Sequence, residues 1–172
     1  MIEIKRQFTD EVIHTFEGES LAGAELAGLS LEVANLAGVD LTGANLEGAN
    51  LAAADLSGAT LIYCNLNGAN LTGTNLSVAN LSLARLQNAE LPSADLSNAT
   101  LYKAHLEKAN LTSANLTGAD LRLAYLLGAD FSFAFFASVD VNGAVFDSDT
   151  TFPMTFFDPV GKGAIQAPKT TE

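Results

Sequence analysis

The sequence has few of the residues that characterise secreted, membrane-spanning or catalytic proteins. Its 172 residues include one cysteine, two histidines, four prolines and no tryptophan. A single cysteine, Cys64, excludes an internal disulfide. Although 48% of the residues are hydrophobic, no run of 18 apolar residues occurs, so no membrane-spanning helix is predicted. The stretch MIEIKRQFTDEV lacks the apolar core of a secretory signal. We therefore expect a cytoplasmic protein that has no membrane partner.

Positive charge is also scarce. Eight Lys and Arg residues stand against 20 Asp and Glu residues, which gives a formal net charge of −12. Binding to nucleic acids draws on clustered Lys and Arg, so direct contact with nucleic acid is not expected. Two interpretations of the acidity stay open: a solvated surface that keeps the protein soluble, or a surface that imitates a polyanion.

Motifs for catalysis or cofactor binding are missing. His14 and His105 lie far apart in the chain, and no HExxH, GxSxG, P-loop or CxxC motif occurs. The many Asn and Asp residues show no metal-ligand spacing apart from their own regular recurrence. The sequence therefore predicts a protein that is not an enzyme and that has no cofactor or metal site.

What the chain does have is a repeat of five residues. From Phe16 to Phe146, all 27 positions whose number leaves a remainder of 1 on division by five are apolar, and most are Leu. Of the 25 sites two residues earlier, between positions 24 and 144, 20 are Ala. The exceptions are Leu29, Val39, Cys64, Thr74 and Val139.

A period of five fits neither a continuous helix nor a continuous strand. Steps of five rotate by about 140° around a helix, and an odd spacing sends successive side chains to opposite faces of a strand. A short strand solves this if Ala and Leu point inward and the Asn or Asp between them points outward. The two remaining residues must then turn the chain. Gly occupies the second of them in 12 units, for example Gly48, and supplies the positive φ that a type II turn needs.

Units such as ANLEG, ADLSG and ANLTS resemble the A-(D/N)-L-x-x repeat of the pentapeptide-repeat family, over about 130 of the 172 residues. The resemblance implies an all-β fold: a right-handed quadrilateral β-helix with four units per coil, capped at both ends. Six to seven coils stacked at ~4.8 Å would form a rod roughly 30 Å long. Cys64 occupies a position where the repeat has Ala, so we interpret it as a small buried hydrophobic residue rather than a reactive thiol.

Both ends of the chain depart from the repeat. Residues 1–15 hold two apolar-rich segments around Thr9-Asp10, which predicts a hairpin that caps the open N-terminal end. The repeat domain is expected over residues 16–148. Residues 149–172 are expected to form a C-terminal cap segment followed by a disordered tail, AIQAPKTTE.

Eight of the ten phenylalanines lie between Phe131 and Phe157. Two of them, Phe133 and Phe135, fall at outward positions of the repeat, so something is expected to cover them. One candidate is the tail, with Phe152, Phe156 and Phe157. The other is a second copy of the chain, because the gyrase-protecting branch of the family that the sequence resembles is dimeric through its C-terminus. The tail's own phenylalanines favour the cap, and hence a monomer.

If four units make one coil, residues 20 apart stack in columns. The Lys, Arg and Tyr residues of the rod then gather on two adjacent sides, while the other two sides carry only acids. Such a strip is a candidate surface for binding a partner protein, or an uneven distribution that arose by chance. Its residues are Tyr63, Leu83, Arg85, Tyr102, Lys103, His105, Lys108, Arg122, Leu123 and Tyr125.

The sequence therefore favours a non-enzymatic structural or protein-interaction module that presents rigid walls to another protein. The alternative is a DNA mimic, resembling the family branch that acts on DNA gyrase. Against it, only 14 acids point outward within residues 14–148, and the chain has none of the loops that interrupt the repeat in gyrase-protecting relatives.

Overall fold

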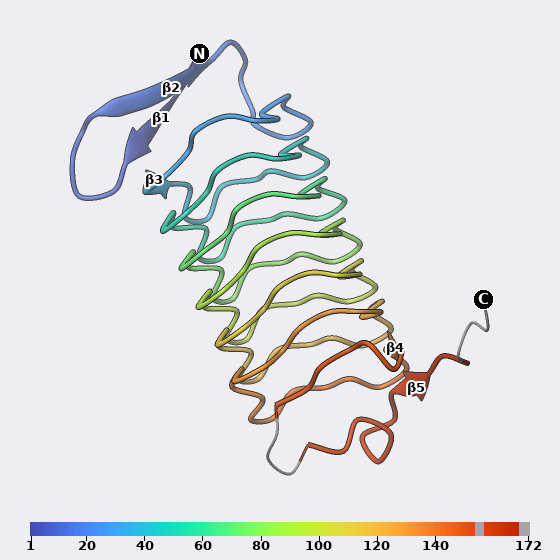
Figure 1. The fold of residues 1–172 in the computed structure, drawn as a ribbon. Coiled ribbons are helices and arrows are strands. Elements are labelled where there is room, and N and C mark those ends of the chain that lie inside the picture. Colours follow the sequence, from blue (N-terminus) through green and yellow to red (C-terminus); the bar gives the residue numbers. More distant parts are fainter. Residues whose placement is uncertain (154–156, 169–172) are drawn as a thin grey trace.

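In the computed structural model, which describes residues 1–153 and 157–168, the chain forms a four-sided coil of β-bridges (Figure 1). The bridges join residues 20 apart in parallel, from Glu25↔Asn45 to Tyr125↔Val145. Four five-residue units therefore make each coil, and the coils stack into a rod. The backbone hydrogen bonds of this ladder join each coil to its neighbours, so the coils satisfy one another's backbone groups. No helix occurs among the described residues.

Each corner is a tight turn. In one unit, the Ala49 N–H donates to the Leu46 carbonyl (3.0 Å), and Gly48 at the third turn position has a φ of +62°. A positive φ recurs at every corner from Gly23 to Gly143, in glycine and non-glycine residues alike. This is the type II geometry that the spacing of the glycines predicts.

Leu and Ala fill the interior, as the period predicts. Leu46, Leu76 and Ala49 are fully buried, as are their counterparts in nearly every coil. Two polar groups replace Ala in the middle of the rod, and each finds a backbone acceptor 23 residues earlier. The Thr74 hydroxyl donates to the Leu51 carbonyl (2.8 Å), and the Cys64 thiol lies 2.7 Å from the Leu41 carbonyl. Burial raises the pKa of the Cys64 thiol to about 12, so it stays protonated.

The N-terminal end carries an antiparallel hairpin of β1 (Ile2–Arg6) and β2 (Val12–Phe16), with Thr9-Asp10 in the connecting loop. β1 also pairs with β3 (Ala34–Asn35), so the sheet order is β2-β1-β3. The hairpin therefore meets one side of the first coil and projects from the rod (Figure 1). Phe16, the first position of the five-residue period, belongs to this hairpin.

At the C-terminal end, β4 (Val145–Phe146) pairs in parallel with β5 (Ile165–Gln166). The expectation of a disordered tail from Ala164 is therefore wrong for these residues, because their backbone extends the ladder by one more rung. The 20-residue spacing ends just before, where Asp130 bridges to Thr151. The extra residue is accommodated by Thr150, whose hydroxyl donates to the Leu126 carbonyl (2.9 Å).

The C-terminal segment closes the end of the rod with aromatic rings. Phe152 stacks on Phe131 with 5.7 Å between ring centroids, and Phe157 packs edge-on against Phe136 at 4.9 Å. The described part of the segment leaves the outward pair open, since Phe133 is 76% and Phe135 64% exposed. The expectation that the tail covers this pair is wrong because Phe152 and Phe157 pack on inward-facing rings instead. The predicted contribution of Phe156 lies outside the described residues.

Candidate functional site

The most unusual corner of the rod carries a large side chain in four successive coils: Tyr63, Leu83, Lys103 and Leu123. Their φ values are +56° to +60°, the left-handed region that favours glycine. An L-residue pays about 1–2 kcal/mol for this conformation. At the other three corners, Gly, Asn, Ser and Ala dominate, and large side chains do not follow one another in successive coils.

The column next to this corner holds a stack of flat groups. The bridges Arg85↔His105 and His105↔Tyr125 place these three residues one above the other. The rings of His105 and Tyr125 stack with 4.5 Å between centroids and 11° between planes. The Nδ1 atom of His105 lies 2.9 Å from Oε1 of Glu107, which holds the ring in this orientation.

We refer to the seven residues of these two columns as the corner strip. Its exposed apolar members include Tyr63 (63%), Leu123 (40%) and Tyr125 (40%). Arg85 and Lys103 are exposed, and among the described residues neither makes an ion pair. The corner strip consists of Tyr63, Leu83, Arg85, Lys103, His105, Leu123 and Tyr125.

The remaining predicted residues lie beside the strip or apart from it. Tyr102 directly precedes Lys103 in the same corner turn, and Nζ of Lys103 and Cζ of Arg122 approach its ring centroid at 5.3 and 5.8 Å. Arg122 is engaged by Asp120 through two hydrogen bonds of 2.7 and 2.8 Å, and these bonds hold the pKa of the Asp120 carboxyl below its usual range. Lys108 is on the next corner and does not join the strip.

Six exposed apolar residues were not singled out by the sequence: Met1, Phe8, Val12, Val78, Val160 and Ile165. Phe8, in the hairpin loop, is 96% exposed, and Val78, on another corner, is 65% exposed. Val12 at the start of β2 is 42% exposed. The sequence could have singled out Val78, because the five-residue period places this β-branched residue at a corner position that requires a positive φ.

No group of three or more His, Cys, Asp or Glu side chains among the described residues could hold a metal ion. Nor does that part of the chain contain a helix long and apolar enough to cross a membrane.

A family model for pentapeptide repeats matches the chain with eight copies, over residues 20–51, 40–77, 79–118 and 109–147. The chain belongs to the pentapeptide-repeat family. The fold of this pentapeptide-repeat protein is accordingly the right-handed quadrilateral β-helix. Among curated protein sequences, none matches it.

Several solved structures of pentapeptide-repeat proteins are similar. Rfr23 from the cyanobacterium Cyanothece 51142 is 32% identical over 76% of this chain and 89% of its own, with a TM-score of 0.46. A protein from the thylakoid lumen of Arabidopsis thaliana is 31% identical over 60% of this chain and 68% of its own, with a TM-score of 0.48. The match to QnrB1, a plasmid-mediated fluoroquinolone resistance protein, covers 88% of this chain and 88% of QnrB1, with a TM-score of 0.55. At 17% identity, QnrB1 shares the fold alone.

Proposed function

We propose that this pentapeptide-repeat protein is a non-enzymatic interaction module whose corner strip binds another protein. The observation that carries the proposal is the run of large residues in left-handed conformation at one corner. Each such residue costs conformational energy, and Tyr63 and Leu123 also leave apolar surface in water, so the stability of the rod does not explain the run. A contact with a partner would bury this surface.

The shape and charge of the strip define its partner. A corner is convex, so the partner contributes a groove rather than a ridge. Arg85 and Lys103 flank the exposed rings and the exposed Leu123, which favours a groove with an apolar floor and acidic edges. The surface is suited to docking rather than catalysis, since the Cys64 thiol is buried and the His105 ring is held between Glu107 and Tyr125.

The test is capture of partners from the source cell with two matched variants of the full chain. The first replaces Tyr63, Leu83 and Leu123 by Gly, the residue that most other corners use. The second replaces Val78 by Gly, and so removes an exposed apolar corner residue outside the strip. We expect the first variant to lose partners that the wild type and the second variant retain. Equal capture by all three proteins would contradict the proposal.

The charge pattern disfavours the alternative, a DNA mimic. Residues 56–84, nearly one and a half coils, contain no charged residue. A DNA duplex carries one charge per ~1.7 Å, which corresponds to about three for every coil of ~4.8 Å. On the wall that carries Asp55 and Asp95, acids also alternate with amides: Asn75 donates to Asp55 and Asn115 to Asp95, both at 3.1 Å. A gyrase supercoiling assay that shows inhibition or protection by the purified protein would restore this alternative.

The oligomeric state is a separate question. The prediction of a monomer depends on the tail covering Phe133 and Phe135, and residues 149–153 and 157–168 leave both exposed. The molar mass in solution decides between the monomer and a dimer through this end. The cytoplasmic location stays a prediction, which fractionation of the source cell would test.

A further inference from the structure

At the N-terminal end of the rod, the ladder of backbone hydrogen bonds between neighbouring coils is interrupted. The interruption lies between residues 19–21 and the segment that ends at Asp40. In the regular coils, the N–H of each inward Leu donates to a carbonyl 19 residues later, as Leu26 does to Asn45 (2.8 Å). The same pattern would pair the Leu21 N–H with the Asp40 carbonyl, but the described backbone makes no such bond. The first rung that does form joins Gly23 to Thr42 (2.8 Å).

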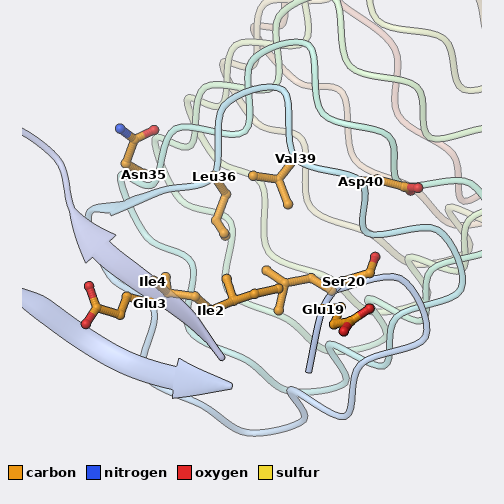
Figure 2. Close-up of a pocket in the computed structure, with 10 residues that line it drawn as sticks. Ile2, Glu3, Ile4, Glu19, Ser20, Asn35, Leu36, Val39 and Asp40 are labelled. Carbon is orange, nitrogen blue, oxygen red and sulfur yellow. The ribbon is translucent and has the colours of Figure 1, made fainter. Parts of the chain in front are cut away.

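The opening leaves a cavity of about 240 Å³ between β1 and the first coil. Figure 2 shows Leu36 and Val39 pointing from the coil toward Ile2 on the opposite side. Val39 occupies an Ala position of the repeat, and both Val39 and Ile2 are only partly buried. The interior of the cavity is therefore apolar and is not filled by the chain itself.

One mouth of the cavity is acidic. Glu19 and Ser20 lie at one end of the gap, and Asp40 lies across from them on the first coil, with its carboxylate directed outward; Glu3 points away from the gap at the other end (Figure 2). The hydrogen bond from the Thr42 hydroxyl to the Asp40 carboxylate (2.6 Å) lowers the pKa of Asp40, so this group is anionic at neutral pH. No Lys or Arg lines the cavity, and the α-amino group of Met1, which donates to the Gly18 carbonyl (2.9 Å), is not part of the lining.

From this combination we infer a binding site for small primary alkylammonium ions, with the alkyl group between Ile2, Leu36 and Val39 and the ammonium at the mouth. An ammonium has three N–H donors. The mouth supplies the carboxylates of Glu19 and Asp40 and the backbone carbonyl of Asp40, to which no described backbone N–H donates. The volume suits a short branched chain of five or six heavy atoms. This site is at the end of the rod and does not depend on the corner strip.

The test is a methyl NMR titration of the full chain with 3-methylbutylammonium as the probe. We expect shifts at the methyl groups of Ile2, Leu36 and Val39. The uncharged 3-methylbutanol should bind about five-fold more weakly, because at an exposed mouth the ion pair contributes a modest Coulomb attraction. The anion 3-methylbutanoate and the short methylammonium ion should not shift these methyl groups.

Variants separate the two parts of the site. Asp40→Asn removes the charge but keeps the geometry, because Asn80 occupies the equivalent position two coils later and accepts a hydrogen bond from the Ser82 N–H (3.0 Å). It should reduce the affinity for the ammonium about five-fold, whereas the control Asp95→Asn, on another wall, should not. Val39→Phe should fill the cavity and abolish binding. Equal affinities for the ammonium and the alcohol, or equal effects of the two Asp variants, would overturn the inference.

Discussion

Replacing Tyr63 by Gly removes a whole aromatic side chain and should change the stability of the rod very little. Relief of the left-handed conformation contributes about 1–2 kcal/mol in favour of the variant. Against it, Gly gains about 0.5–1 kcal/mol of backbone entropy in the unfolded chain. Because Tyr63 is 63% exposed, only about a third of the 1.5–3 kcal/mol of a fully buried side chain is lost. The terms nearly cancel, so the free energy of unfolding should stay within about 1 kcal/mol of the wild type.

The comparison of Gly with Ala at this position makes the prediction sharper. Tyr63→Ala loses the same contacts but keeps the left-handed conformation, so the Gly variant should be the more stable of the two by about 0.5–1 kcal/mol. This reverses the usual order of Ala and Gly. As a matched control, Ser57 is the first of the two residues of its corner and does not have a positive φ, so Ala should be more stable than Gly there.

The assay is urea unfolding followed by far-ultraviolet circular dichroism, with all variants at one temperature and one protein concentration. A loss of more than about 2 kcal/mol for Tyr63→Gly would refute the reasoning. The corner residues would then stabilise the stacked coils, and the free-energy cost of their left-handed conformation would no longer indicate a binding surface.

Three further predictions concern the interior and the charged wall. Leu76→Ala in the middle of the rod should cost about 2–5 kcal/mol, because Leu76 is fully buried, and Leu76→Lys should prevent folding; a soluble β-rich protein with Lys at this position would contradict the inward assignment. The Cys64 thiol should not react with a thiol reagent at pH 8 until the protein unfolds, because burial raises its pKa to about 12; rapid labelling of the native protein would contradict this. Arg122→Gln should raise the pKa of Asp120 measured by NMR. The contact between Arg122 and Asp120 stabilises the fold fully above the carboxyl pKa of the unfolded chain, about 3.9, and this stabilisation is lost as the pH falls through the lower pKa of the folded state. The wild type should therefore stay folded to a lower pH than the variant. An unchanged Asp120 titration in the variant would show that Arg122 does not cause the shift.

Much of the rod follows from the period alone, because a strand of three residues and a corner of two satisfy both the inward pattern and the glycine positions. The 20-residue coil then places His105 above Arg85 and below Tyr125, and the rings do stack. The departures from Ala are informative as well. Leu29 and Val39 lie in the first coil, where no regular coil covers them, and both are only partly buried.

The ends could not be derived in the same way. The pairing of Ile165–Gln166 with β4 joins residues 20 apart in the sequence, but the intervening chain does not follow the repeat, so no periodicity predicts this pairing. Outward positions for Phe133 and Phe135 were predicted, but which rings the tail would cover depends on the path of the chain across the end. The cavity beside Val39 depends on a rung of the ladder that does not form, which no sequence pattern records.

The most direct test of the central claim is site-specific photo-crosslinking in the source cell. A photoreactive phenylalanine analogue is placed in turn at Leu123 in the corner strip, at Val78 and at Phe133, three exposed apolar corner positions. The account predicts a crosslinked product of defined mass from position 123 and none of that mass from positions 78 or 133. The same product from all three positions, or from position 78 or 133 but not from 123, would contradict a partner that binds through the corner strip.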